Sequence, residues 1–293
     1  MALVGSYVAL SKPLVAAFPV FLLAWLRFGI AALAMPHWLR KPADEAAVMS
    51  GRTRGLVFLE SLLGNFLFSI CMLFGIRHST ALAAGVIMAA LPAVVALLSW
   101  WLLEEQVGVR VAAGIACAIA GIALVAFARD ADGELASGSL AGIALLVGAV
   151  TCEALYVVIG KKLSASMGPK RISALINLWG LVLVAPFALW QLRGFSPSFI
   201  PESSWWLLLA YSIAASVVTV WLWMTGLKHV PASSAGIFTV FLPVTAAAVG
   251  AFFYGEEFTT AQAAAFALAL AGVVLAAWPA RRSASVAAVL PSA

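Results

Sequence analysis

The chain has 293 residues, of which 64% are hydrophobic and only 10% charged, and its mean hydropathy is +1.08. This composition excludes an ordinary water-soluble domain and is typical of a polytopic membrane protein. The formal net charge of +5 does not indicate nucleic-acid binding, because Lys and Arg are dispersed between apolar runs. We therefore expect contact with the lipid bilayer and no nucleic-acid partner.

Apolar runs long enough to cross about 30 Å of hydrocarbon as helices recur along the whole chain. No basic segment or cleavage site precedes the first run, so we expect that run to remain a helix. The expected spans are 1–17, 18–38, 56–76, 80–103, 107–128, 138–160, 172–190, 205–227, 232–254 and 259–279. The prediction is an all-α integral membrane protein with ten transmembrane helices, because a β-barrel would show alternating polarity instead.

The positive residues predict the orientation in the membrane. With a cytoplasmic N-terminus, the cytoplasmic joints carry Arg40, Lys41, Arg52, Arg54, Arg110, Lys161, Lys162, Lys170, Arg171, Lys228, Arg281 and Arg282. The opposite joints carry only Lys12, Arg77, Arg129 and Arg193. By the positive-inside rule both termini lie in the cytoplasm. We expect a multi-pass protein of the cell's inner (plasma) membrane.

The two halves of the sequence resemble each other. A shift of 151 positions aligns Gly75 with Gly226, His78 with His229, Gly85 with Gly236, Pro92 with Pro243 and Glu105 with Glu256. Slightly smaller shifts align Tyr7 with Tyr156, Lys12 with Lys161 and Pro36 with Pro186. Since five helices per copy is an odd number, the second copy enters the membrane in the opposite sense, as in many carriers. The expected parts are a first repeat 1–128, an outward linker 129–137, a second repeat 138–280 and a cytoplasmic tail 281–293.

Two polar stripes indicate where a binding site lies. They occupy matched helices of the two repeats and consist of Ser61, Asn65, Phe68 and Met72 in the first and Ser212, Ser216, Thr219 and Trp223 in the second. Each set lies on one helix face. Because polar atoms facing lipid are costly, the stripes are expected to face each other or a wet cavity. Hydrogen bonding between helices by small polar residues is the alternative.

Four ionisable residues fall inside expected spans, where they are rarely kept without a partner or a task. Glu153 is the candidate for proton coupling or for binding a substrate ammonium. Arg27 could hold a substrate carboxylate or neutralise an acidic neighbour, and Lys12 is a second candidate for the carboxylate. For Glu60, near the cytoplasmic end of its span, we favour pairing with Arg52 or Arg54.

Aromatic residues away from the membrane interfaces suit the walls of a cavity for flat or amphipathic molecules, although packing is the alternative. The full set of candidate substrate-binding residues is Tyr7, Lys12, Arg27, Ser61, Asn65, Met72, Trp101, Glu153, Tyr156, Asn177, Ser212, Ser216, Thr219, Trp221 and Trp223. Pro92 and Pro243 occupy equivalent positions inside expected spans and are candidate hinges, because proline kinks a helix.

Motifs of enzymes and cofactor sites are not found in the sequence. It contains no Walker A spacing, no HExxH pair and no GxSxG elbow. We expect no enzymatic activity, no cofactor and no metal ion.

Several segments together resemble the EamA-type carriers of the drug/metabolite transporter superfamily. They are the stretch from Gly5 through Tyr7 to Lys12, Arg27, and the paired runs from Ala81 through Pro92 to Glu105 and from Ala232 through Pro243 to Glu256. The resemblance covers essentially the whole chain, although Val4 stands where that family usually has Trp. It implies two five-helix repeats and ATP-independent, often proton-linked export of amino acids or related metabolites; some relatives export aromatic amino acids.

The sequence therefore predicts a secondary-active exporter of small metabolites, amino acids including aromatic ones first among them, that works by alternating access as a monomer or a homodimer. Within the carrier class the alternative is a multidrug or nucleotide-sugar transporter. From a different class, a channel or a structural membrane subunit is the alternative.

Overall fold

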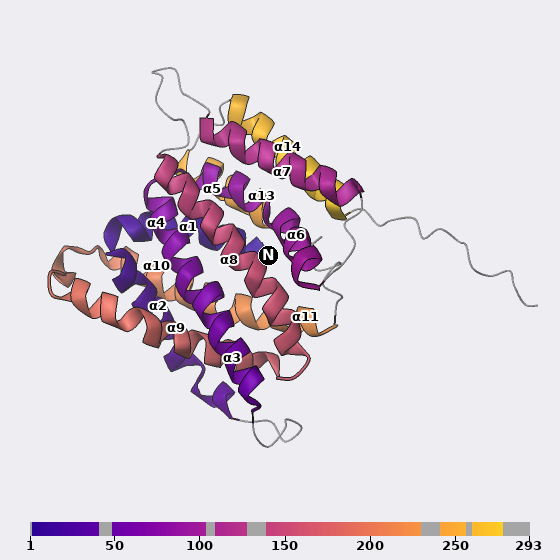
Figure 1. Ribbon diagram of the computed structural model, residues 1–293. Helices are drawn as coiled ribbons and strands as arrows, with labels where there is room; N and C mark the ends of the chain where they lie inside the picture. The colour runs from indigo at the N-terminus through magenta and orange to yellow at the C-terminus, as the bar shows by residue number, and fades with distance from the viewer. Residues whose placement is uncertain are drawn as a thin grey trace, which may run out of the picture.

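The computed structural model describes residues 2–40, 49–103, 109–127, 139–229, 241–255 and 260–277. Within these ranges the regular elements are helices, as the sequence predicts (Figure 1). The expected linker 129–137 and tail 281–293 lie outside the described residues, as do Glu105 and Glu256.

In the first half, helices cover the expected spans in chain order. They are α1 (Ala2–Ala17), α2 (Val20–Ala34), the short 3-10 helix η1 (Pro36–Leu39), α3 (Gly51–Glu60), the π-helical segment η2 (Ser61–Leu67), α4 (Phe68–Arg77), α5 (Ala81–Met88), α6 (Leu91–Leu103) and α7 (Val109–Phe127). Hydroxyl caps set two of the starts, since the Ser50 side chain accepts a hydrogen bond from Thr53 N and the Thr80 side chain accepts one from Ala83 N.

The second half follows the same order. It consists of α8 (Leu140–Ser164), α9 (Pro169–Leu192), the 3-10 helix η3 (Pro197–Phe199), α10 (Glu202–Ser212), the π-helical segment η4 (Ile213–Thr219), α11 (Val220–His229), α13 (Phe241–Tyr254) and α14 (Thr260–Ala277). Ser139 caps α8 by accepting from Gly142 N. Pro169 opens α9 at a position where its missing N–H leaves no bond unmade.

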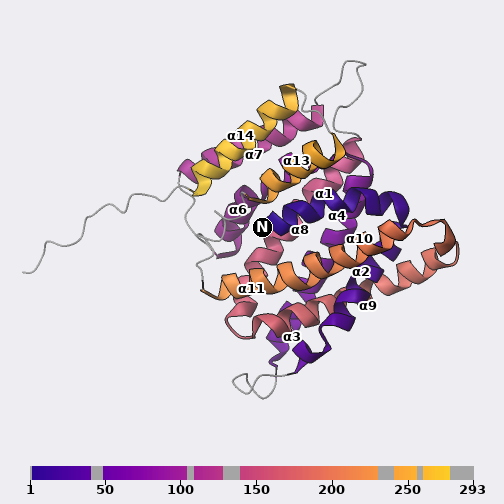
Figure 2. The ribbon, with the colours of Figure 1, turned by 180° about the vertical axis from the view of Figure 1, so that it is seen from behind.

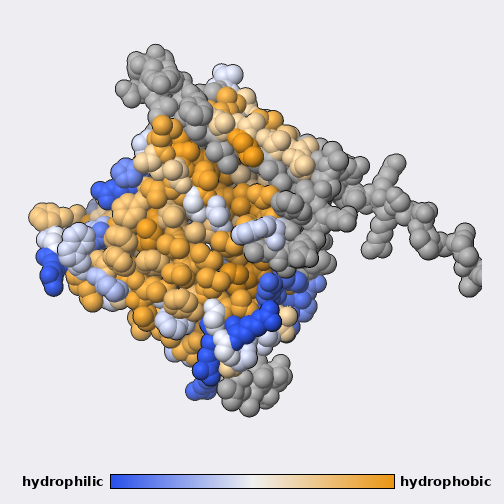
Figure 3. All heavy atoms as spheres, in the orientation of Figure 1, coloured by the Kyte–Doolittle hydropathy of each residue, from blue (hydrophilic) through white to orange (hydrophobic). Residues whose placement is uncertain are grey.

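Four continuous helical stretches in the described part of the chain are long and apolar enough to cross a bilayer: Gly51–Arg77, Leu140–Ser164, Pro169–Leu192 and Glu202–His229. The remaining apolar helices are shorter. The helices form one layered bundle in which α7 lies beside α14, and α2 packs on α9 (Figures 1 and 2). A broad apolar surface covers the middle of the face in Figure 3, and hydrophilic side chains gather toward its edges.

The π-helical segments occur at matching places in the two halves. η2 lies between α3 and α4, and η4 lies between α10 and α11. A shift of 152 positions carries Ser61–Leu67 onto Ile213–Thr219, within one residue of the sequence overlay. π-Helical turns are rare, change the direction of the side chains that follow, and are frequent at functional sites.

Pro92 does not kink a continuous helix, contrary to the single span expected over 80–103. The chain breaks at a turn after Met88, and Pro92 is the second residue of the next helix, α6. Proline is favoured in a first turn because its missing N–H has no intrahelical partner there. Pro243 lies in α13, and the residues that precede Phe241 are outside the described part of the chain. Hinge motion at these two prolines remains a prediction.

Candidate functional site

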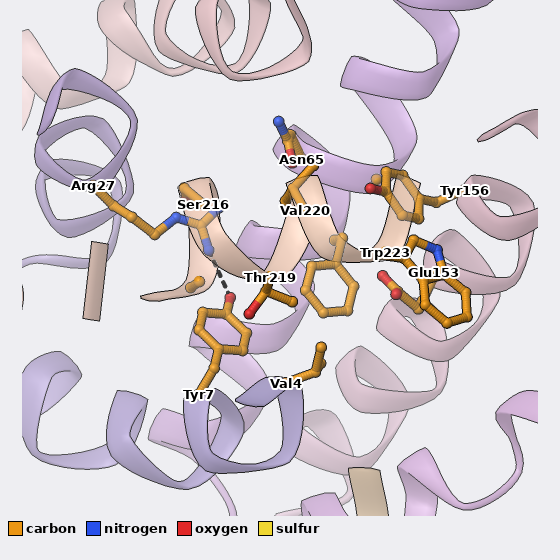
Figure 4. Close-up of a pocket in the computed structure, with 13 residues that line it drawn as sticks. Val4, Tyr7, Arg27, Asn65, Glu153, Tyr156, Ser216, Thr219, Val220 and Trp223 are labelled. Atoms are coloured by element: carbon orange, nitrogen blue, oxygen red, sulfur yellow. Dashed lines mark hydrogen bonds between the residues drawn. The ribbon is translucent and has the colours of Figure 1, made fainter. Parts of the chain in front are cut away.

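A pocket, which we call the central pocket, lies between α1, α2, α8 and the two π-helical regions, in the interior of the bundle (Figure 4). Its lining comes from both halves of the chain and consists of Val4, Tyr7, Arg27, Gly64, Asn65, Phe68, Glu153, Tyr156, Ala215, Ser216, Thr219, Val220 and Trp223. The cavity volume is about 60 Å³, whereas one water needs only about 10–15 Å³. In this conformation the pocket has room for a few waters or a small polar group.

Arg27 of α2 forms one end of the pocket. Its guanidinium donates hydrogen bonds from Nη1 to Tyr7 Oη at 2.8 Å and from Nη2 to Ser69 Oγ at 2.6 Å. The charge also lies over the Phe28 ring, 4.3 Å from its centroid. Nε has no hydrogen-bond partner among the described residues. Since a guanidinium has five N–H groups, Arg27 is fixed in place and retains donors for an anionic ligand.

Glu153 of α8 forms the opposite end (Figure 4). It is buried, and Tyr156 lies beside it on the same helix. Gly64 makes room for this tyrosine, because a Cβ atom on Gly64 would lie 2.8 Å from Cγ and 2.9 Å from Cβ of Tyr156. An isolated carboxylate is expensive to bury, so a cation or a proton is the expected complement of Glu153.

Unsatisfied polar atoms lie between the two ends. Asn65 Nδ2, Thr219 Oγ1 and Trp223 Nε1 are buried and have no hydrogen-bond partner within the described residues. Asn65 belongs to η2, Thr219 ends η4, and Trp223 follows on α11. Because buried polar groups are normally hydrogen-bonded, three such atoms around one cavity indicate that a polar ligand or water completes them.

Glu60 is a buried acid, and the predicted pairing of Glu60 with Arg52 or Arg54 is wrong. It makes no hydrogen bond to Arg52 or Arg54, and both of its carboxylate oxygens are buried without a hydrogen-bond partner in the described part of the chain. The side chain is fully buried at the end of α3. A Cβ atom on Gly160 of α8 would lie 2.8 Å from Oε1, with Met224 and Leu227 nearby. α3 therefore directs Glu60 into the bundle, whereas Arg52 and Arg54 stay exposed at its start.

Eight of the predicted residues line the pocket: Tyr7, Arg27, Asn65, Glu153, Tyr156, Ser216, Thr219 and Trp223. Four other predicted residues do not line the pocket and instead make hydrogen bonds or core contacts within the bundle. Ser61 and Ser212 donate to the carbonyls of Val57 and Leu208 within their own helices, and Met72 is fully buried core. Asn177 Nδ2 donates to the carbonyls of Ser173 and Ser216, at 2.8 and 3.0 Å, and so ties α9 to η4.

The three remaining candidates do not line the pocket. Trp101 is 72% exposed on α6, which does not suit a wall of an interior cavity. Lys12 is half-buried in the last part of α1. Trp221 lines a different pocket, together with Trp38.

The pattern of the sequence did not indicate Val4, Gly64, Ala215 and Val220, which also line the cavity, nor Ser69, which positions Arg27. Gly64 and Ala215 are aligned by the shift of 151 positions, and both precede a polar stripe residue by one position. Small residues at equivalent places next to polar ones are the signal that could have revealed them. Among the described residues, no three His, Cys, Asp or Glu side chains lie together as a metal site would require.

Comparison with known proteins identifies the family. The EamA-like transporter family matches residues 1–127 and 140–278. The chain belongs to this family and is a multi-pass membrane protein of the transporter class.

Its relatives carry general names. A Bacillus subtilis protein described as uncharacterized transporter YetK is 30% identical over 93% of this chain and 83% of its own length. Another from the same organism, uncharacterized transporter YwfM, is 27% identical over 72% of this chain and 71% of its own. A solved crystal structure superposes with a TM-score of 0.63 at 21% identity, covering 94% of this chain and 93% of that one, which supports the fold alone.

Proposed function

We propose that this protein is a secondary carrier that exports small zwitterionic metabolites, amino acids with large apolar or aromatic side chains first among them, across the inner membrane. The observation that carries the proposal is the placement of Arg27 and Glu153 at opposite ends of one buried pocket (Figure 4). A free amino acid carries a carboxylate and an ammonium on one carbon, so it complements both ends at once.

The residues between the two charges fit the rest of such a substrate. Tyr7, Phe68, Tyr156 and Trp223 supply aromatic wall, and Tyr7 is already stacked on Tyr211 at 4.9 Å between ring centroids. Aromatic side chains contact flat apolar groups favourably. The unpartnered atoms of Asn65, Thr219 and Trp223 are positioned to bond the polar head of a substrate.

The size of the cavity implies movement. About 60 Å³ is far less than the roughly 300–1,000 Å³ of pockets that enclose organic ligands. A bound amino acid therefore requires the helices around the pocket to separate. Alternating access between two inverted five-helix repeats, with both termini cytoplasmic, supplies that separation. The two π-helical segments border the pocket from both halves and are where we place the bending.

Glu153 and Glu60 are the groups we assign to coupling with protons. Glu153 faces the pocket, and Glu60 lies against Gly160 of the same helix, α8, about two turns further along. A buried carboxyl group without a partner favours its neutral, protonated form, so each acid takes up a proton when no cation is near. Export driven by proton entry would use this exchange.

Uptake into proteoliposomes tests the function. Purified protein is reconstituted, the vesicles are either preloaded with unlabelled substrate or left empty, and uptake of labelled tryptophan, methionine and threonine is measured. A carrier gives saturable uptake that preloading accelerates. Flux indifferent to preloading would indicate a channel, and absence of flux for all amino acids would overturn the proposal in favour of drugs or nucleotide sugars as substrates.

Competition by analogues tests the assignment of the two charged ends. Tryptamine lacks the carboxylate and indole-3-propionate lacks the ammonium, so both should compete with labelled tryptophan at least about tenfold less well than tryptophan itself. In Arg27→Gln the penalty for tryptamine should disappear, and in Glu153→Gln the penalty for indole-3-propionate should disappear. Equal competition by all three compounds in the wild-type protein would contradict the zwitterion site.

A pH series tests the coupling. Glu153→Gln should remove the pH dependence of net transport, while exchange of labelled for unlabelled substrate persists at a reduced level. An unchanged pH dependence would remove Glu153 from the coupling and direct attention to Glu60→Gln.

A further inference from the structure

A second, more open pocket lies at the end of the bundle where η1, the start of α9 and the end of α11 meet. Its cavity volume is about 470 Å³. Arg40, Lys170, Arg171 and Lys228 line it together with His37 and His229, and none of the lining residues within the described ranges is acidic. Four cations from three separate segments around one hollow form a basic pocket, which favours an anionic ligand.

Two tryptophans form part of the wall of this basic pocket. The Trp38 and Trp221 rings lie 6.1 Å apart, and Lys170 Nζ is 6.0 Å from each ring centroid. Cation–π contact favours the ammonium over the two rings, and an ammonium so placed can still donate hydrogen bonds to an anion. The first turn of α9, which begins at Pro169 within the pocket, adds the partial positive charge of a helix N-terminus.

The surroundings of the basic pocket match the membrane interface. Arg40, Lys170, Arg171 and Lys228 all belong to joints that the positive-inside rule places in the cytoplasm. Tryptophan is favoured at the level of lipid headgroups. The adjoining helices expose apolar side chains: Leu33 of α2 is 84% exposed, Leu178 of α9 is 39% exposed and Leu222 of α11 is 50% exposed. A phosphate ion would use only the cations, whereas the acyl chains of a phospholipid would also contact exposed apolar side chains of these helices.

We propose that the basic pocket binds the phosphate headgroup of an anionic phospholipid from the cytoplasmic leaflet, with the acyl chains along the exposed apolar side chains of α2, α9 and α11. Basic pockets between transmembrane helices on the cytoplasmic side are the sites where such headgroups bind. α11 connects this site with the central pocket, because Trp221 lines one and Trp223 lines the other. The lipid therefore restrains the helix that carries part of the candidate substrate site.

Lipid binding to the purified, detergent-solubilised full chain tests the proposal without any transport measurement, so its outcome is independent of the substrate. Dioleoylphosphatidylglycerol is added in increasing amounts, and bound lipid is counted by native mass spectrometry while the melting temperature is recorded. Dioleoylphosphatidylcholine, which carries a phosphate but no net charge, is the comparison lipid. We expect saturable binding and a higher melting temperature with the anionic lipid only.

A matched pair of variants separates the pocket from general surface charge. Arg40→Gln/Lys170→Gln/Lys228→Gln removes three exposed cations of the basic pocket, and Arg52→Gln/Arg54→Gln/Lys162→Gln removes three exposed cations of other cytoplasmic segments. Because each cation near an anionic lipid surface strengthens binding, the first variant should bind phosphatidylglycerol at least about tenfold more weakly. The second should bind it within about threefold of the wild-type protein.

Three results would overturn the proposal. The first is an equal loss in both triple variants, which would indicate nonspecific attraction. The second is equal stabilisation by phosphatidylcholine. The third is binding of glycerol 1-phosphate or inorganic phosphate as tight as that of phosphatidylglycerol, which would assign the pocket to a free phosphate.

Discussion

The two halves of this protein share a backbone pattern and differ in chemistry. Both contain a helix with a π-helical segment in its middle, and the shift of 151 positions places Glu60 opposite Tyr211 and Asn65 opposite Ser216. With the shift of 150 that aligns Pro36 and Pro186, Arg27 falls opposite Asn177, since 27 + 150 = 177. The two halves therefore match in the place of the π-helical segment but differ in the side chains at the overlaid positions.

Arg27 and Asn177 differ in what their side chains contact. Arg27 bonds two hydroxyl groups and lines the central pocket, whereas Asn177 bonds two backbone carbonyls and is buried between α9 and η4. The pocket has one cationic end because only the first half carries a charged residue at this position.

The largest effect is expected from substituting Arg27, in comparison with the same substitution of Asn177. Arg27→Ala should raise the concentration of tryptophan needed for half-maximal transport by about 10- to 100-fold, because a charge-assisted contact contributes about 1.5–3 kcal/mol. Asn177→Ala should chiefly lower the melting temperature. Transport kinetics and thermal melts of both variants check this, with Arg27→Lys as the variant that retains the charge. Similar losses of affinity in both would contradict the division of roles.

Gly64 and Ala215 occupy equivalent places but differ in available space. Gly64→Ala should destabilise the protein by as much as about 3 kcal/mol, because the new methyl group would overlap Tyr156. The reverse change in the other half, Ala215→Gly, should lower stability by about 1 kcal/mol or less. Denaturation in detergent, followed by tryptophan fluorescence, measures both; a harmless Gly64→Ala would show that Tyr156 moves freely.

Tyr7 and Tyr156 are aligned tyrosines at the two ends of the pocket. Tyr7→Phe should lower stability by about 1.5 kcal/mol, because it leaves Arg27 Nη1 without its hydroxyl partner. Tyr156→Phe should change stability less, since Tyr156 makes no hydrogen bond to the residues drawn with it in Figure 4. Equal losses of stability in thermal melts would argue against the positioning of Arg27 by Tyr7.

The smallest effect concerns Glu60 and Tyr211, whose side-chain oxygens are buried without hydrogen-bond partners among the described residues. Glu60→Met should stabilise the protein by about 1 kcal/mol, because it replaces an uncompensated polar group by an apolar one of similar shape. Tyr211→Phe should be close to neutral. Thermal melts compare the two, and a destabilised Glu60→Met would reveal a partner for Glu60 in the folded protein.

The sequence by itself determined the helical class, the places of the apolar helices and the family, because hydrophobic length and residue spacing are local properties. It also indicated the helix faces that carry Asn65, Ser216 and Thr219. All three line the central pocket.

Tertiary structure decided which of these faces meet. Helical periodicity places Met72 on one stripe with Asn65, and Ser212 on the other stripe with Ser216. In the structure, the π-helical turns and the packing of neighbouring helices put Met72 and Ser212 in the core. The direction of Glu60 depended on the same packing, since α3 presents Arg52 and Arg54 to the outside and Glu60 to α8. Spacing along one helix defines a face, but only contacts between helices define what that face touches.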